Sequence, residues 1–296
     1  MKIKILSFAL AGLCLGYGSM TFADTHPAQI SPDNIVNRLA RQYRSTPKDC
    51  GGTPARPAFT CSGLMIRGTM PSAQYHSWNP SLNSIKSGGT SFSYMRADVK
   101  FGKLAYGYKN GFILYPQSKA PKSMTTLRVL CMFPIDGDTD RRTNAGCGTH
   151  QYFPKDSREC SKQGITRSSA WLSHYVHTRG NRRQHTCAFD LYQRSNSANM
   201  FAQSLVSQTR LGNEGFATQN ELRISTWAQD IGPILPIQAF FYIEGGLDGA
   251  RHDQTDFYND TGRIVPIVKI VLPKDRSQLA QFTYTATDQA VAATTP

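Results

Sequence analysis

The stretch ATQNELRIS, residues 217–225, decides whether the last third of the chain contains a strand or a helix beside a glutamate. Thr218 and Glu221 have the T-x-x-E spacing of a helix capping box, in which the glutamate binds a backbone N–H and does no chemistry. In a strand, by contrast, Gln219, Glu221 and Arg223 share one face, because successive side chains alternate. Apolar and polar residues alternate in LRIS, so the period favours a strand, and the capping box remains the alternative.

The segments outside this stretch predict one α+β domain. Pro32, preceded by Ser31 and followed by apolar residues at four-residue spacing, predicts an amphipathic helix. Short β-like runs occupy residues 62–69, 88–95, 126–134, 236–246 and 264–273, and helical patterns occupy 166–177, 197–211 and 253–260. Residues 103–116 (KLAYGYKNGFILYP) predict a hairpin with Asn110-Gly111 as its turn. A single domain of this length can bury an ample core.

The N-terminus predicts export. Residues 1–23 contain two lysines, then an apolar run, then a small-x-small sequence ending at Ala23, which is typical of a signal peptide. We therefore expect a secreted protein, extracellular or periplasmic, with residues 24–296 as one mature domain. The run is too short to be preferred as a membrane anchor, and no later stretch resembles a transmembrane helix.

Six cysteines follow the predicted signal peptide, and all of them lie between residues 50 and 187. An even number in an oxidising compartment predicts three disulfides, for which 15 connectivities remain open. The spacings lack paired C-x-x-C units, so disulfides are favoured over a metal-thiolate site. We expect no bound metal and no resident cofactor.

The chain is basic, with a formal charge of +13 that falls to +11 when Lys2 and Lys4 leave with the signal peptide. A basic secreted protein can bind nucleic acid, an anionic surface or a phosphate-bearing small molecule. The basic residues are spread along the sequence, so no specific nucleic-acid site is expected. A non-catalytic binding protein for anionic surfaces or nucleic acid is one alternative function.

Two further segments contain candidate functional residues. Arg67 stands between an apolar run and Gly68, where a strand meets a turn, and its planar guanidinium suits phosphate. Ser91 and Ser93 alternate with Phe92, so both hydroxyls share one strand face and could hold a neighbouring carboxylate. Each pattern is also typical of an ordinary strand.

An arginine at a strand end, a Ser-x-Ser strand and a Gln-x-Glu strand, in this order, resemble the Arg–Ser–Glu class of ADP-ribosyltransferases, the cholera-toxin-like group. Across nearly the whole mature chain the sequence is similar to halovibrin, a secreted bacterial family of that group. The segments that carry the similarity are CSGLMIRGTMPS, YHSWNPS, GGTSFSYMRAD, NELRISTWAQDI, LPIQAFFYIEGGLDGA and TGRIVPI. The resemblance implies a split, twisted, mainly antiparallel β core flanked by helices and stabilised by disulfides.

The resemblance also implies an activity, which is cleavage of the nicotinamide–ribose bond of NAD, as NAD-glycohydrolase or mono-ADP-ribosyltransferase. NAD would be the substrate, and water or a protein side chain the acceptor. Glu221 would stabilise an oxocarbenium-like transition state, and Ser91 and Ser93 would orient it. Gln219 would position the acceptor. Arg67, with the adjacent Gly68, would bind the dinucleotide.

The sequence departs from the toxin pattern in two respects. The middle element is Ser-Phe-Ser instead of Ser-Thr-Ser, and the separation between Ser93 and Gln219 is longer than the pattern requires. Glu244, at the end of another predicted strand, is a rival for the catalytic carboxylate. His174 and His185, which lie near basic residues, leave a secreted ribonuclease as a further alternative.

Overall fold

The structure is a computed structural model that describes residues 32–69, 90–120, 128–137, 147, 159–178, 186–191, 196–225 and 235–291. The helices and strands all fall within one compact unit, Ser31–Pro296. The expected signal peptide lies outside the described residues. Among the described residues, no helix is long and apolar enough to cross a membrane.

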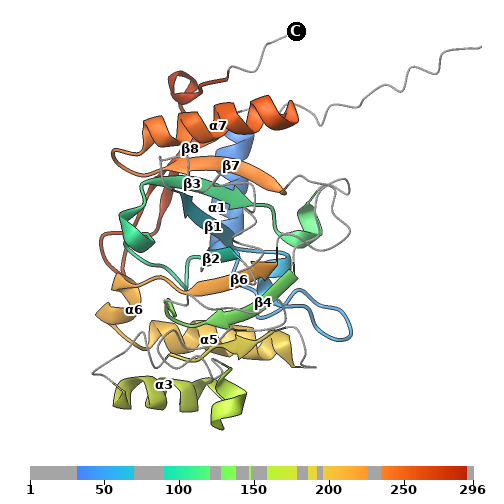
Figure 1. Cartoon of the computed structure of the whole chain (residues 1–296), viewed down its shortest axis with the longest axis vertical. Helices are drawn as coiled ribbons and strands as arrows, with labels where there is room; N and C mark the ends of the chain where they lie inside the picture. Colours follow the sequence, from blue (N-terminus) through green and yellow to red (C-terminus); the bar gives the residue numbers. More distant parts are fainter. Residues whose placement is uncertain are drawn as a thin grey trace, which may run out of the picture. The chain divides into compact units, whose positions relative to one another are not determined.

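Nine strands form a mainly antiparallel sheet in the order β5-β4-β6-β2-β1-β3-β7-β8-β9, with β7 and β8 as its parallel pair (Figure 1). Their bounds are β1 Leu64–Thr69, β2 Thr90–Met95, β3 Asn110–Leu114, β4 Arg128–Phe133, β5 Phe189–Asp190, β6 Glu221–Ser225, β7 Ile237–Tyr242, β8 Ile267–Val271 and β9 Gln281–Thr283. The predicted α+β class with a mainly antiparallel sheet is confirmed.

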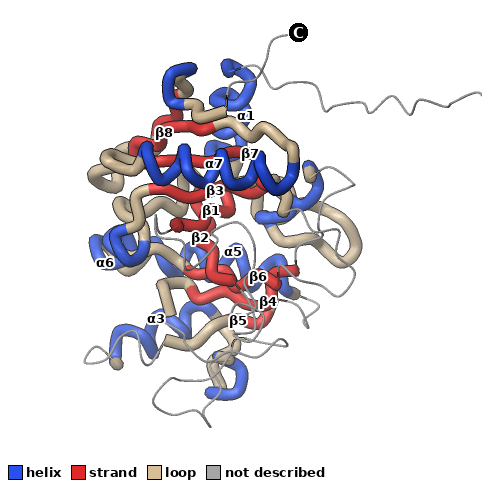
Figure 2. Tube along the Cα trace, turned by 45° about the horizontal axis from the view of Figure 1, so that its top comes forward, coloured by secondary structure: helices blue, strands red, loops and turns tan. Residues whose placement is uncertain are grey.

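The helices are α1 Pro32–Arg44, α3 Ser168–His177, α5 Ser197–Thr209, α6 Asn213–Ala217 and α7 Leu247–Thr261. Helix α7 packs on β7 and β3 (Figure 2). Helix α5 contacts β4 and β5, and α3 packs against α5. Helix α1 contacts β1 and β9. Its apolar residues Ile35, Leu39 and Tyr43 are all buried, as the four-residue spacing predicts.

The predicted hairpin around Asn110-Gly111 is wrong. Asn110 and Gly111 begin β3, and the preceding turn is formed at Tyr106 and Gly107, both of which have positive φ. Gly111 lies opposite Gly68 in the sheet, and a Cβ atom on it would come within 1.9 Å of the Arg67 carbonyl oxygen. The glycine is therefore required by a close approach between two strands, which a local turn pattern cannot reveal.

Strands β1 and β2 diverge part of the way along their length. They pair from Leu64 to Ile66 with Ser93 as the partner of Ile66. Beyond that point the rest of β1 pairs with β3, and Thr90–Phe92 pairs with β6. Backbone that leaves its neighbour in this way opens a gap between two adjacent strands of the same sheet.

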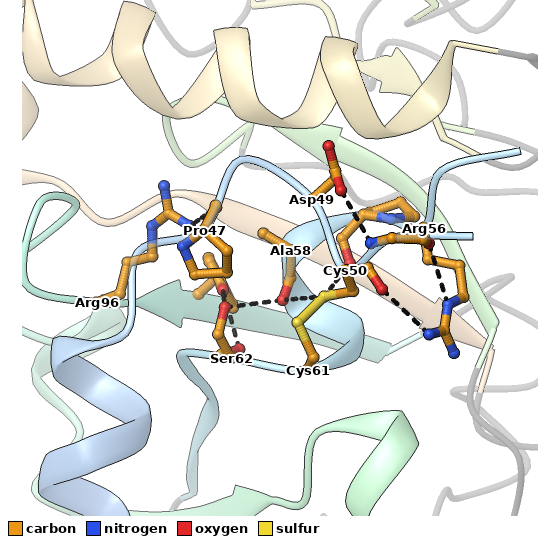
Figure 3. The surroundings of a disulfide bond; sticks show 11 residues. Pro47, Asp49, Cys50, Arg56, Ala58, Cys61, Ser62 and Arg96 are labelled. Atoms are coloured by element: carbon orange, nitrogen blue, oxygen red, sulfur yellow. Dashed lines mark hydrogen bonds between the residues drawn. A yellow bond between two sulfur atoms is a disulfide. The ribbon is translucent and has the colours of Figure 1, made fainter. Parts of the chain in front are cut away.

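The structure contains two disulfides, one fewer than the cysteine count predicts. Cys50 is bonded to Cys61 and Cys160 to Cys187, whereas Cys131 and Cys147 are free and buried. The first disulfide joins the segment after α1 to the segment before β1. Around it Arg56 donates to the Cys50 carbonyl at 3.1 Å (Figure 3).

Candidate functional site

A cavity of about 180 Å³ occupies the gap where β1 and β2 diverge. The cavity is lined by every residue that the sequence analysis assigned to the site around Glu221. These residues come from three adjacent strands, β1, β2 and β6, and from the loop before β6. The full lining consists of Ile66, Arg67, Gly68, Thr90, Ser91, Phe92, Ser93, Ala105, Tyr106, Tyr108, Asp136, Gln219 and Glu221.

Glu221 is the first residue of β6, and its side chain is only 3% exposed. Its Oε1 accepts a hydrogen bond from Ser91 Oγ at 2.6 Å, and its Oε2 accepts one from the backbone N–H of Gly137 at 3.2 Å. Both carboxylate oxygens are thus held by donors from other elements of the fold. A buried carboxyl group with such partners has a fixed orientation toward the cavity that it lines.

The strand interpretation of ATQNELRIS is confirmed, and the capping box is not formed. Thr218 is the C-cap residue of α6, and strand β6 begins at Glu221, so no helix starts after Thr218 for it to cap. In the antiparallel ladder Ser91 lies opposite Arg223. Because side chains alternate along β6, Glu221 lies on the same face as Arg223 and hence as Ser91.

Asn220, which the sequence interpretation missed, attaches this segment to β2. Its side-chain Oδ1 accepts from the backbone N–H of Tyr94 at 2.8 Å, and its Nδ2 donates to the Tyr94 carbonyl at 2.8 Å. The amide therefore imitates a paired backbone, and its contact lies two residues beyond the last β2–β6 pair, Phe92 and Leu222. Asn220 is fully buried, and no local sequence pattern indicates this contact.

Arg67 bridges the gap between the diverging strands. Its Nη1 donates to the carbonyl oxygen of Ser91 at 2.8 Å, and its guanidinium lies 6.0 Å from the centre of the Phe92 ring. The first contact fixes the backbone of the residue that holds Glu221. The guanidinium also contributes a positive charge to the lining of the cavity.

Gln219 and Asp136 are joined through their backbones at the far side of the cavity. The N–H of Asp136 donates to the Gln219 carbonyl oxygen at 2.7 Å, and both side chains line the cavity. No role at this site was assigned to Asp136 by the sequence analysis.

Two tyrosines stand at the opposite side, on the loop between β2 and β3. The ring centres of Tyr106 and Tyr108 are 5.7 Å apart, and the Tyr106 side chain is 70% exposed. Tyr106 has φ 51°, a left-handed conformation that costs a non-glycine residue free energy. Gly68 allows Tyr108 to approach, because a Cβ at Gly68 would meet the Tyr108 ring at 2.6 Å.

A second cavity, of about 470 Å³, shares Asp136 with the first. It is lined by residues of α3 and α6 and by the loop after α6. The hydroxyl of Tyr175 donates to Glu214 Oε1 at 2.8 Å in this region. The two cavities therefore adjoin at Asp136, and both are lined by the segment that leads into Glu221.

Glu244 is the alternative catalytic carboxylate of the sequence analysis, and His174 and His185 are the residues of the alternative ribonuclease. Glu244 is an exposed residue in the turn after β7 and does not line the Glu221 cavity. His174 and His177 lie on α3, and His185 lies outside the described residues. In the described part of the chain, no group of three or more histidine, cysteine, aspartate or glutamate side chains could hold a metal ion.

Comparison with protein-family models gives no matching family, and comparison with curated proteins gives no match.

Proposed function

We propose that the protein is a secreted enzyme that cleaves the nicotinamide–ribose bond of NAD, as an NAD-glycohydrolase, a mono-ADP-ribosyltransferase or both, on an ADP-ribosyltransferase-like fold. The observation that carries the proposal is the convergence of Arg67, Ser91, Ser93, Gln219 and Glu221 on one cavity. Its location, in a gap between two diverging strands, agrees with the split β core that the resemblance implies.

The chemistry requires a fixed negative charge more than it requires covalent machinery. As the nicotinamide–ribose bond breaks, positive charge develops on the ribose, as in glycoside hydrolysis. The carboxylate of Glu221, oriented by Ser91 and Gly137, would stabilise that charge and bind a ribose hydroxyl. Because the donors are already in place, little reorganisation is needed in the transition state.

The size and lining of the cavity suit the reactive end of the dinucleotide. An engineered cavity of about 150 Å³ binds benzene, so about 180 Å³ has room for one six-membered ring such as nicotinamide. Tyr106 and Tyr108 would stack on an aromatic ring at the entrance. Arg67 would provide positive charge for the phosphates, and Gln219 would position water or a protein side chain as acceptor.

The decisive experiment replaces Glu221→Gln and measures nicotinamide release from NAD. Glutamine keeps an oxygen that can accept a hydrogen bond from Ser91, but it removes the negative charge, so we expect a loss of about 10²–10³-fold in kcat. The melting temperature should stay close to that of the wild type.

Glu244→Gln is the matched control, since it removes a carboxylate from an exposed turn outside the cavity. It should keep full nicotinamide release. Full activity of Glu221→Gln, or loss of activity in Glu244→Gln alone, would reject Glu221 as the catalytic carboxylate. Salt-sensitive binding to polyanions without NAD turnover in the wild type would favour the binding protein instead.

A further inference from the structure

Cys131 and Cys147 form a buried pair that neither disulfide uses. They belong to one cluster of buried residues with Phe133 and Ala188, and both are at most 1% exposed. Cys147 therefore lies close to Cys131 inside the protein, and the two thiols influence each other's ionisation. Two buried cysteines in one cluster are candidates for a disulfide bond, which requires their Cα atoms to lie within about 7 Å of each other.

The pair lies in a row of side chains that reaches the candidate site. Across the sheet Asp190 lies opposite Cys131, Cys131 lies opposite Arg223, and Arg223 lies opposite Ser91. Residues that face one another across adjacent strands share one face of the sheet. The row therefore connects Cys131, through the fully buried Arg223, to the hydroxyl-bearing residue that holds Glu221.

The chain between the two cysteines supplies the backbone donors of the site. It leaves β4 at Phe133 and then provides the Asp136 N–H to Gln219 and the Gly137 N–H to Glu221. A Cβ at Gly137 would come within 2.5 Å of the Phe133 ring, so this segment packs tightly on a member of the cysteine cluster. A bond between Cys131 and Cys147 would close the chain that carries both donors, Asp136 and Gly137, into a loop anchored on β4.

We propose that Cys131 and Cys147 form a third disulfide in the exported protein, and that this bond holds the Gly137 N–H against Glu221. The reaction is thiol–disulfide exchange with an external disulfide. Cys131 and Cys147 lose their thiol hydrogens, one S–S bond forms between them, and the external disulfide is reduced to two thiols. The positioning part rests on the proposed function of Glu221, whereas the bond itself does not.

The folded chain protects the thiols, so the bond should form during folding. Burial, followed by the adjacent Cys131 thiol, raises the pKa of Cys147 well above its usual value. The thiolate, which is the attacking species in exchange, is therefore scarce once the cluster is packed. A chain folded under reducing conditions should keep two free thiols that react slowly with alkylating agents until it is unfolded.

The first test is disulfide mapping by mass spectrometry of protein produced in an oxidising compartment, with free thiols alkylated in denaturant at acidic pH. We expect a linked pair of peptides containing Cys131 and Cys147, besides the pairs Cys50–Cys61 and Cys160–Cys187. Alkylation of both Cys131 and Cys147, or their linkage to other cysteines, would overturn the proposal. This readout does not depend on any enzymatic activity.

The second test examines the positioning role with the double variant Cys131→Ala/Cys147→Ala. Loss of a disulfide that closes a loop of this size should lower the melting temperature by on the order of 5–10 °C. The amide of Gly137 should exchange with solvent at least about tenfold faster than in the oxidised wild type, because its segment opens locally more often. Nicotinamide release should fall with it.

The double variant Cys50→Ala/Cys61→Ala is the matched control, because it also removes one disulfide, at the segment drawn in Figure 3. It should lower the melting temperature but leave the exchange of the Gly137 amide unchanged. If exchange of the Gly137 amide is accelerated equally in both variants, the cause is general destabilisation, and the positioning role is rejected. If no form of the protein turns over NAD, the mapping and the exchange rates still decide the proposal.

Discussion

Two carboxyl groups in this protein are buried to nearly the same degree and accept similar hydrogen bonds, but one lines the candidate site and the other does not. Glu221 is 3% exposed and accepts hydrogen bonds from a serine hydroxyl and a backbone N–H. Asp253, on α7, is 4% exposed and accepts at 2.8 Å from the Thr69 hydroxyl and at 2.9 Å from Asn110 Nδ2. Burial and partners alone do not distinguish them.

The difference lies in what surrounds the carboxyl group beyond its partners. Glu221 lines a cavity with an arginine, a glutamine and two tyrosines, whereas Asp253 is not among the described residues that line it. Asp253 instead connects α7 to the ends of β1 and β3, where Thr69 and Asn110 lie. Under the proposed function, one buried polar network serves a reaction and the other joins elements of the fold, and access of a ligand separates the two.

The largest effect on stability should come from Asp253→Ala. This change removes the acceptor of the Thr69 hydroxyl and one of the two acceptors of Asn110 Nδ2 inside the protein, at a cost of about 2–3 kcal/mol. We expect a melting temperature lower by about 5–10 °C, measured by calorimetry, with nicotinamide release per folded molecule unchanged.

Asp260→Ala is the control on the same helix, because Asp260 is exposed near the C-terminus of α7. Its removal should change the free energy of unfolding by no more than about 0.5 kcal/mol. A loss of catalysis in Asp253→Ala at temperatures where the variant is fully folded would contradict the division of roles between the two carboxyl groups.

The hydroxyl donors provide a smaller and more direct comparison. Ser91→Ala removes a hydrogen bond to the carboxyl group of Glu221, and such a bond is worth about 1.5–3 kcal/mol when the acceptor is charged. We expect kcat for nicotinamide release to fall about 10–100-fold, with a small change in melting temperature.

Thr69→Val is the counterpart at Asp253 and should lower stability without altering kcat. The measurements are kcat from steady-state kinetics and the melting temperature from thermal unfolding, each for both variants. The reverse pattern, with Ser91→Ala unstable but active, would show that the Ser91–Glu221 contact is structural.

The smallest effect is expected at the entrance to the cavity. Tyr106→Gly removes an exposed ring and places glycine at a positive φ, which glycine adopts without strain. We expect a KM for NAD raised about threefold to tenfold, because one stacking contact contributes about 0.5–1.5 kcal/mol. The melting temperature should not fall by more than a few degrees. An unchanged KM would remove Tyr106 from the binding surface.

Local patterns predicted the elements well wherever burial follows a regular period. The apolar spacing of Ile35, Leu39 and Tyr43 gave a helix whose three residues are buried, and the alternation in LRIS gave strand β6. The pattern failed at Asn110-Gly111, because the same two residue types that favour a tight turn also serve a close contact between strands. Only the partner strand decides between these uses.

The candidate site was predicted in part for the same reason. Ser91 and Glu221 carry recognisable chemistry, so they could be named in advance, and the structure places them 2.6 Å apart. Gly137, Asn220 and Tyr106 carry none in their local context. Gly137 acts through its backbone N–H and Asn220 through an amide that imitates a strand, and both need a partner distant in the sequence. Tyr106 lines the cavity from a left-handed turn whose place beside β1 depends on the fold.

The sequence by itself determined the α+β class, the mainly antiparallel strands and the residue types at the candidate site, because alternation and side-chain chemistry are properties of neighbouring residues. The tertiary structure decided which of those residues meet. Ser91 and Glu221 are separated by 130 positions, and they come together because β2 leaves β1 and pairs with β6. Contacts over that distance depend on strand order and register, which no local pattern specifies.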